Sequence, residues 1–272
     1  MSFVPARLLC FLLLASISFR IYPQEPEGTS LRKRYEGEKN GPRGECSTDW
    51  TTLDGGLHYR AVRCLGSADL DFHLVSIDPD RWKIDTTLVD RGSARDVARA
   101  RGARFAINAN FFDTSRNALG LVVRSGEQVR SPRSTSWQSI FLIRKDGAAK
   151  IVLPKSWTAE KSKAWMAVQA GPRLVVDGHT ARVRQSYTAA RSGVCIQKKN
   201  RIVFFATPSD RKFDMYEMAR IARRDEADGG MACHDAMLFD GGHSTQLFLN
   251  TEKKDVSVTG DAVPVFIHAV AK

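Results

Sequence analysis

Short apolar segments that alternate with polar residues run through most of this chain. They are rich in β-branched residues and are bounded by Gly, Pro or Asp, which is typical of β-strands. Eight segments show the pattern most clearly: LHYRAVRCL, LDFHLVSID, WKIDTTLVD, GLVVRSGEQV, SIFLIRKDG, AAKIVLP, PRLVVDG and RIVFFATP. Two further segments, ARDVARARGA and FDMYEMARIARRD, have helical character instead. Many strands and few helices predict an α+β fold, a single domain with mixed, largely antiparallel sheets.

The chain has 272 residues, of which 43% are hydrophobic, so it can bury one sizeable core. Its formal net charge of +11 favours an anionic partner, such as a phosphate-bearing glycan, a nucleic acid or a membrane surface. A nucleic-acid surface would need basic residues clustered on one face with aromatic residues among them. Here the basic residues are dispersed and the aromatic residues lie in apolar strands, so we expect no nucleic-acid partner.

The first 20 residues have the pattern of an export signal. Arg7 precedes an apolar run at residues 8–17, and Ser16 and Ser18 are small residues suited to a cleavage point. The apolar run is shorter than the ~20 residues that a membrane-spanning helix needs, and a retained anchor is the alternative. We therefore expect a periplasmic or secreted protein that contacts a membrane only through an uncleaved N-terminus.

The next segment, residues 21–45, is rich in charge, Pro and Gly and poor in apolar residues. Such a composition cannot bury enough surface to offset the entropy lost on ordering, so it predicts a flexible linker. The folded domain is expected to cover residues 46–272.

Four cysteines remain beyond the signal segment, and four allow three full disulfide connectivities. An exported protein meets an oxidising compartment, where pairing is favoured. Cys46 and Cys64 flank a predicted first hairpin and form the preferred pair. Cys195 and Cys233 lie in apolar surroundings and are expected to be buried thiols.

Four irregular segments interrupt apolar runs with polar side chains or glycines of the kinds that bind ligands or take part in catalysis. The first, RFAINANFFDT, places Asn108, Asn110 and Asp113 after a strand. An amide side chain both donates and accepts hydrogen bonds, which suits the hydroxyls of a sugar. The alternative is ordinary Asx-turn chemistry.

The second and third segments lead into apolar strands. AVQAGPRLVVDG carries Gln169 and Gly171, although a Gly-Pro pair is also ordinary turn material. YTAARSGVCIQ carries Arg191, whose guanidinium offers a rigid fork that matches two oxygens of a phosphate or carboxylate. The alternative for Arg191 is a solvated surface arginine.

The fourth segment, AMLFDGGHSTQLF, ends an apolar run with Asp240. Gly241 and Gly242 follow, and the backbone amides of such a loop can hold an anion, to which Ser244 and Thr245 add hydroxyl groups. Asp-Gly is also a favoured hairpin turn. The loop is longer and richer in donors than a tight hairpin requires.

Together these segments resemble a known family. INANFFD, GLVV, QAGPRLVVDG, RSGVCI and ACHDAMLFDGGHSTQL occur in the order, and with roughly the spacing, of the phosphodiester glycosidase family. The resemblance runs from about Trp50 to the end and is closest to the exported bacterial members. Cys195 stands where those members often have Gly, and His243 stands where the lysosomal members tend to have Gly.

The resemblance implies a hydrolase that cleaves a sugar 1-phosphodiester at the anomeric carbon, with a role in envelope or exopolysaccharide metabolism. Its partner would be a phosphorylated glycan. Arg191 and the amides of Gly241 and Gly242 would hold the phosphate, and Asp240 would be the leading catalytic carboxylate. Asp113 would be a second carboxylate or a metal ligand.

The remaining candidate site residues would bind and orient the substrate. They are Asn108, Asn110, Gln169, Gly171, Ser244 and Thr245. Calcium or magnesium would suit the hard oxygen ligands Asp113 and Asp240, although nothing in the spacing requires a metal. The main alternative function is a glycan-binding envelope protein without catalysis.

Overall fold

The structure is a computed structural model that describes residues 49–63, 71–183 and 187–272. The chain divides into two units, Met1–Arg43 and Gly44–Lys272, and the described residues belong to the second. The predicted export signal, the predicted linker and the predicted Cys46–Cys64 pair lie outside the described residues. Within the described part, no helix has the length and apolar character needed to cross a membrane.

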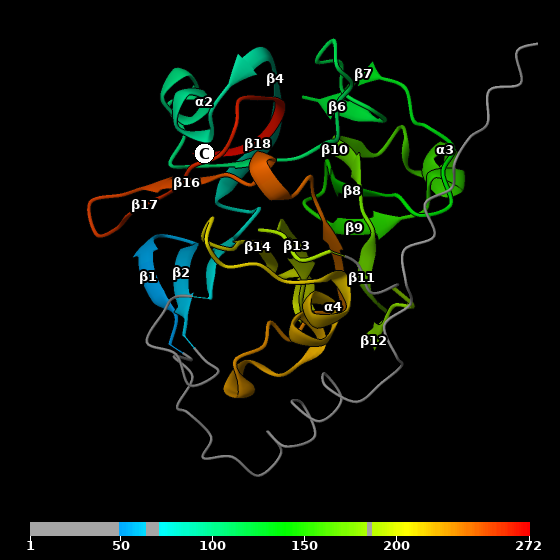
Figure 1. Ribbon diagram of the computed structural model, residues 1–272. Helices are drawn as coiled ribbons and strands as arrows, with labels where there is room; N and C mark the ends of the chain where they lie inside the picture. Colours follow the sequence, from blue (N-terminus) through cyan, green and yellow to red (C-terminus); the bar gives the residue numbers. More distant parts are fainter. Residues whose placement is uncertain (1–48, 64–70, 184–186) are drawn as a thin grey trace, which may run out of the picture. The chain divides into compact units, whose positions relative to one another are not determined.

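Three antiparallel sheets form the framework of this unit (Figure 1). The eight-stranded sheet has the order β1 (Thr51–Asp54), β2 (Leu57–Val62), β3 (Phe72–Ile77), β14 (Ile202–Ala206), β13 (Ser192–Ile196), β15 (Asp235–Leu238), β11 (Arg173–Val176), β12 (His179–Thr180). One five-stranded sheet has the order β7 (Glu127–Arg130), β6 (Val122–Arg124), β10 (Ala164–Ala170), β8 (Ser139–Arg144), β9 (Ala149–Val152). The other has the order β17 (Asp255–Val258), β16 (Leu247–Asn250), β5 (Phe105–Asn108), β18 (Val263–Ala271), β4 (Trp82–Gly92).

The expected α+β fold is confirmed, and each of the eight predicted strand segments contains at least one strand. The first hairpin joins β1 to β2 through the Gly55-Gly56 turn. The two predicted helical segments form α2 (Ala94–Arg101) and α4 (Met215–Arg223). The C-terminal strands β16 to β18 are additional to the segments singled out from the sequence.

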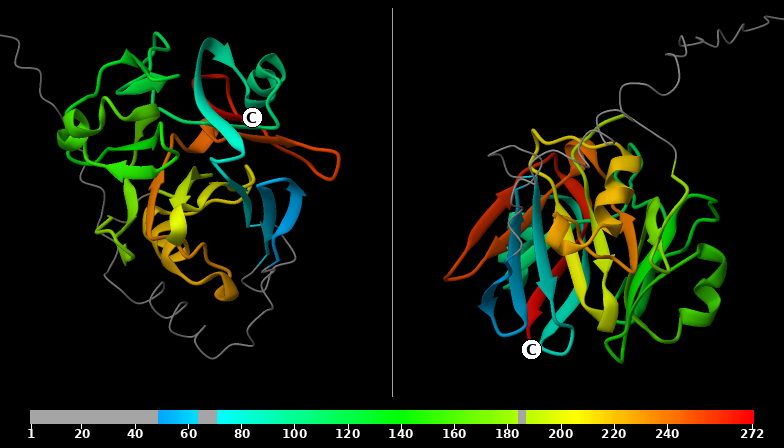
Figure 2. Two further views of the ribbon diagram at one scale, coloured as in Figure 1. Left: turned by 180° about the vertical axis from the view of Figure 1, so that it is seen from behind. Right: turned by 90° about the horizontal axis from the view of Figure 1, so that it is seen from below.

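The three sheets share one hydrophobic core. Phe204 on β14 packs its ring 5.1 Å from that of Phe105 on β5 and 5.9 Å from that of Phe141 on β8, measured between centroids. One side chain therefore touches all three sheets. Figure 2 shows the sheets from behind and from below, where their strands converge on this common interior.

The helices are fixed by their caps and by their apolar faces. Asp214 and Glu217 form a reciprocal capping box at the start of α4, which satisfies backbone donors that the helix leaves open. Ser93 caps the start of α2, and Gly102, in the left-handed conformation, ends it. The shorter helices are α3 (Trp157–Glu160), η1 (Pro154–Ser156), η2 (Lys198–Asn200), η3 (Glu226–Asp228) and η4 (Gly242–Ser244).

The prediction that Cys195 and Cys233 are separate buried thiols is wrong, because they form a disulfide. Both residues are buried, with their Cα atoms 5.4 Å apart. Cys195 lies on β13, and Cys233 comes shortly before β15, the antiparallel neighbour of β13. This strand pairing, which no local sequence pattern reveals, brings together two cysteines that are 38 residues apart.

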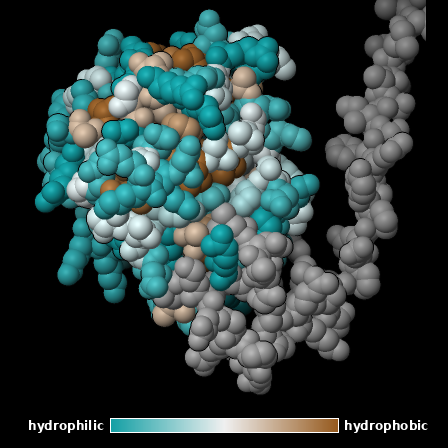
Figure 3. All heavy atoms as spheres, turned by 90° about the vertical axis from the view of Figure 1, so that its left-hand side faces the viewer, coloured by the Kyte–Doolittle hydropathy of each residue, from teal (hydrophilic) through white to brown (hydrophobic). Residues whose placement is uncertain are grey.

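Polar side chains cover most of the face that lies to the left in Figure 1, and apolar atoms show only in small areas between them (Figure 3). This distribution agrees with an interior that holds the apolar faces of the strands.

Candidate functional site

The candidate site is centred on the end of β5, where strands of two sheets meet. All four residues of β5 are buried, and the strand pairs with β16 and β18. Its last residue, Asn108, is 1% exposed. The Nδ2 of Asn108 donates to the backbone carbonyl of Asp240 at 2.6 Å, and its Oδ1 accepts from the Ser192 hydroxyl at 2.9 Å and the Gln246 amide at 3.0 Å.

Asn108 thus joins the start of β13 to both ends of the loop that connects β15 to β16. The Ser192 hydroxyl also lies 3.2 Å from the Asp240 carbonyl. Because these partners are protein groups, the side chain of Asn108 holds the loop in place. The predicted contact between Asn108 and a sugar hydroxyl stays a prediction.

Asp240 follows β15, and its backbone amide donates to the carbonyl of Ala109 at 2.9 Å. Burial raises the pKa of the Asp240 carboxyl to about 6, although hydrogen bonds from Ser244 and from the Gly241 amide act in the opposite direction. A carboxylate with a pKa near neutrality can take up and release protons at physiological pH. Perturbed groups of this kind concentrate at functional sites.

The two glycines after Asp240 let the backbone turn into η4, which lies near the meeting point of the three sheets in Figure 1. Gly242 has φ +62°, a left-handed conformation that glycine adopts readily. Its amide donates to the carbonyl of Ala190 at 2.8 Å. Since the Gly241 amide serves the Asp240 carboxylate, neither glycine could bind a phosphate through its amide without exchanging a hydrogen bond.

Arg191 lies directly before β13 and is 4% exposed, so it is not a solvated surface arginine. Its Nε donates to the carbonyl of Phe213 at 2.9 Å and its Nη2 to that of Tyr187 at 2.8 Å. A Cβ atom added to Gly241 would lie 3.5 Å from Nη1. The guanidinium is therefore held against the loop that carries Asp240, and burial lowers its pKa. The phosphate-binding role that the family resemblance implies for Arg191 stays a prediction.

Gln169 and Asn110 bind neighbouring backbone segments. Gln169 is fully buried on β10, accepts from the amides of Leu121 and Arg133 at 3.0 and 2.9 Å, and donates to the Arg133 carbonyl at 2.7 Å. Asn110 donates to the Leu121 carbonyl at 3.1 Å. These contacts fasten two segments beside the site, and the predicted substrate contacts of both residues stay predictions.

Gly171 lies where two segments approach closely. A Cβ atom at this position would lie 2.8 Å from the carbonyl oxygen of Trp137, so a side chain would require the backbone to move. Pro172, which follows through a cis peptide bond, accepts a hydrogen bond from the Leu238 amide at 3.0 Å. The segment of Trp137 therefore lies beside the strand that leads to Asp240.

Asp113 belongs to a separate turn. Its Oδ1 accepts from the Asn117 backbone amide at 2.8 Å, and this hydrogen bond lowers the pKa of the Asp113 carboxyl. No described hydrogen bond or ion pair joins Asp113 to Asp240. The Asp113 carboxylate thus bonds within its own turn, and its catalytic role stays a prediction.

Two hydroxyls of the Asp240 loop differ in their surroundings. Ser244 bonds to the Asp240 carboxylate, whereas the Oγ1 of Thr245 is buried without a hydrogen-bond partner among the described groups. Ser192 and Trp137 were missed as site residues. Ser192 was adjacent to the predicted Arg191, and Trp137 stands alone as an aromatic residue in the polar run SPRSTSW.

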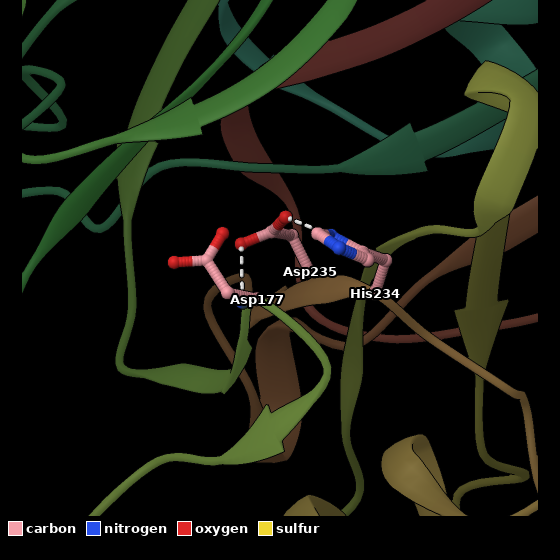
Figure 4. A group of neighbouring side chains, drawn as sticks. All are labelled: Asp177, His234 and Asp235. Carbon is pink, nitrogen blue, oxygen red and sulfur yellow. Dashed lines mark hydrogen bonds and ion pairs between the residues drawn. The ribbon is translucent and has the colours of Figure 1, made fainter.

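Among the described residues, one group has the composition and spacing to hold a metal ion: Asp177, His234 and Asp235, shown in Figure 4. The Asp235 carboxylate already has partners, because it accepts from His234 Nδ1 at 2.9 Å and from Arg173 Nη2 at 2.9 Å. The Arg173 cation supplies the charge that a metal would otherwise bring. The group is better described as an ion-pair network, and the calcium or magnesium ion suggested for Asp113 and Asp240 stays a prediction.

The Asp-Gly-Gly loop lies within a single α+β domain, and a sequence model of the phosphodiester glycosidase family matches residues 101–268. The chain belongs to this family. A search of curated proteins found no match.

Two solved structures share the fold. The first is the zebrafish N-acetylglucosamine-1-phosphodiester alpha-N-acetylglucosaminidase catalytic domain, auto-inhibited by its pro-peptide. It has a TM-score of 0.58 and 16% identity over 81% of this chain and 80% of that one. The second, a hypothetical protein from Synechocystis, has a TM-score of 0.57 and 14% identity over 79% of this chain and 62% of that one.

Proposed function

We propose that this protein is a hydrolase that cleaves a sugar 1-phosphodiester at the anomeric carbon. One observation carries the proposal: Asp240, a largely buried carboxylate with a pKa of about 6, lies in a loop against which Arg191 is held. Membership of the phosphodiester glycosidase family supports the reaction type. A water oxygen bonds to the anomeric carbon while the bond from that carbon to the phosphate oxygen breaks.

Asp240 supplies the carboxylate near the reacting carbon. With a pKa of about 6 it is mostly ionised at pH 7, yet basic enough to accept the proton that the attacking water loses. Its negative charge also stabilises the positive charge that develops on the sugar ring. The leaving phosphomonoester is a good leaving group, so it needs less protonation than the alcohol released in ordinary glycoside hydrolysis.

Arg191 provides the positive charge for the phosphate. Hydrogen bonds to the carbonyls of Phe213 and Tyr187 fix the plane of its guanidinium. Nη1 lies near Gly241, and we place the phosphate beside this guanidinium. A guanidinium fork matches two phosphate oxygens in a way that a lysine does not.

An aromatic pair supports the sugar part of the proposal. Trp137 is 50% exposed, and its ring lies edge-on to that of Phe111, with 5.3 Å between centroids. Trp137 contacts Gly171 through its carbonyl, and Phe111 comes two residues after Ala109, which binds the Asp240 amide. An exposed aromatic face beside polar groups suits the apolar face of a sugar ring.

The name of the zebrafish enzyme points to N-acetylglucosamine 1-phosphodiesters as the first substrates to test. We further propose that the protein is exported, to the periplasm or outside the cell, and acts on phosphorylated glycans of the envelope or of exopolysaccharide. The signal-like N-terminus and the Cys195–Cys233 disulfide support an oxidising compartment.

The decisive experiment measures the sugar released from a panel of sugar 1-phosphodiesters, including UDP-N-acetylglucosamine. Purified protein is compared with Asp240→Asn and Arg191→Ala, and Asp255→Asn, which changes an exposed strand residue, is the matched control. Release that persists in the control and disappears in both site variants supports the proposal. Folded protein that binds glycans but turns over no member of the panel would favour the alternative, a glycan-binding protein without catalysis.

A further inference from the structure

A cavity of about 380 Å³ lies beside the candidate site and takes no part in the mechanism above. The residues that matter for its chemistry are Asp90, Arg91, Ser115, Arg116, Arg130 and Pro264. They come from four segments: the end of β4, the turn that contains Asp113, the end of β7 and the start of β18. We call this cavity the basic pocket.

Three arginines line the basic pocket, against one acidic residue, Asp90. Cations that share one concave surface repel one another, and an anion between them removes that repulsion. In the described part of the chain, neither Arg91 nor Arg130 forms an ion pair. Both side chains are exposed, so their guanidinium groups are accessible to a ligand.

Arg116 is held more firmly than the other two. Its Nη1 donates to the backbone carbonyl of Ala262, and its guanidinium lies 5.5 Å from the centroid of the Phe112 ring. These contacts restrict the side chain before any ligand arrives, which reduces the entropy lost on binding. Arg116 therefore gives the pocket one fixed cation, and Arg91 and Arg130 can adjust around it.

The backbone connects the basic pocket to Asp240 in a few steps. Pro264 precedes Val265, whose carbonyl accepts from the Ala109 amide at 3.0 Å, and the Ala109 carbonyl in turn accepts from the Asp240 amide at 2.9 Å. The antiparallel pairing places the end of β4, the start of β18 and the end of β5 at the same end of their sheet. A substrate at Asp240 could therefore extend into the pocket.

We propose that the basic pocket binds an anionic group on the substrate, a phosphate or a carboxylate, that is separate from the phosphodiester being cleaved. The natural substrate would then carry at least two anionic groups, as in a polyphosphorylated or acidic glycan. The part of this inference that identifies the ligand as the substrate rests on the proposed function. The binding of an oxyanion in the pocket can be measured without any catalysis.

The test uses the double variant Arg91→Ala/Arg130→Ala in the full chain, because both side chains are exposed and their removal should leave the fold intact. The matched control is Arg99→Ala/Arg104→Ala, which removes the same charge from exposed positions outside the pocket. Calorimetric titrations with inorganic pyrophosphate and with glucuronic acid separate a phosphate preference from a carboxylate preference. We expect at least one probe to bind wild type and control equally, and to bind the pocket variant about tenfold or more weakly.

A second arm compares KM for UDP-N-acetylglucosamine with KM for the methyl phosphodiester of N-acetylglucosamine 1-phosphate, which lacks the second phosphate. The pocket variant should raise KM about tenfold for the first substrate only, with kcat unchanged. The inference would be overturned if each probe bound the pocket variant and the control with the same affinity. It would also be overturned if neither probe bound the wild-type protein. If neither substrate is cleaved, the proposed function fails while the titrations still decide whether the pocket binds anions.

Discussion

The side chain of Asn108 donates to the backbone carbonyl of Asp240 at 2.6 Å, so an amide at the end of β5 holds the loop that carries this carboxylate and joins two sheets. The same side chain accepts from Ser192 and from Gln246. The position of Asp240 therefore depends on contacts between distant parts of the chain.

Asp240→Asn should lower kcat by about 10²- to 10⁴-fold, the usual contribution of a general acid or base. The wild-type kcat/KM should rise with pH through an inflection near 6, because Asp240 must lose its proton to act as a base. Steady-state rates between pH 4 and 8 check both points. A wild-type profile that is flat across this range would contradict the assigned role.

The same carboxyl should make the unfolding free energy depend on pH. Its pKa is about 6 in the folded protein against a reference value of 3.8, so the folded state binds more protons than the unfolded state between these values. Stability should therefore fall as pH rises from about 4 to 6, by about 3 kcal/mol in total. Asp240→Asn should remove this dependence, and urea unfolding at pH 4 and pH 7 measures it. Asp255→Asn is the control and should keep the wild-type slope.

Asn108→Ala should destabilise the protein by about 1–3 kcal/mol, because it leaves the buried Gln246 amide without its side-chain acceptor and the Ser192 hydroxyl with only the Asp240 carbonyl. It should also lower kcat, since the Asp240 loop loses its tether. Asn117→Ala, which changes an exposed amide, is the comparison. Chemical denaturation together with activity assays checks the prediction, and a stable, fully active Asn108→Ala protein would refute it.

The Cys195–Cys233 disulfide closes a loop with a sequence separation of 38 residues. In the chain-entropy description, a loop of this size stabilises the folded state by about 4 kcal/mol. Cys195→Ala/Cys233→Ala should therefore lower Tm markedly, and reduction of the wild-type protein should shift Tm in the same direction. Calorimetric scans with and without a reductant measure both effects, and a double variant as stable as oxidised wild type would contradict the expectation.

Trp137→Ala should raise KM for sugar phosphodiesters while leaving kcat nearly unchanged, if the ring binds the sugar without taking part in bond breaking. Trp137→Phe should restore part of the affinity, because it keeps an aromatic face. Tyr216→Ala is a matched control, since Tyr216 is also 50% exposed but lies on α4. Equal KM values for Trp137→Ala and Tyr216→Ala would exclude the aromatic platform.

Local pattern was sufficient to predict the eight strand segments and the two main helices and to single out the Asp240 loop, but it missed the C-terminal strands β16 to β18. Strand alternation and helix capping each involve residues that are close together in the chain. Both can therefore be recognised in the sequence alone. The approach of Arg191 to Gly241 was expected only through the family resemblance. Its near-complete burial in a strongly basic chain had no local signal.

Pairings between distant strands could not be predicted in the same way. Cys195 and Cys233 become neighbours only because β13 and β15 are adjacent. Likewise, the partners of Asn108 are set by how two sheets end beside each other. The predicted residues Gln169 and Asn110 lie near the site, but the sequence could not reveal that they bind the backbone of residues 121 and 133.

The meeting of three sheets at Phe204 has a consequence for cooperativity of unfolding. No sheet can separate without exposing part of the common core, so subdomains that retain native packing on their own are not expected. Enzymatic activity and strand content should then disappear at the same denaturant concentration. Activity would be a faithful reporter of the fully assembled native state, and a partly denatured population would be a mixture of active and unfolded molecules.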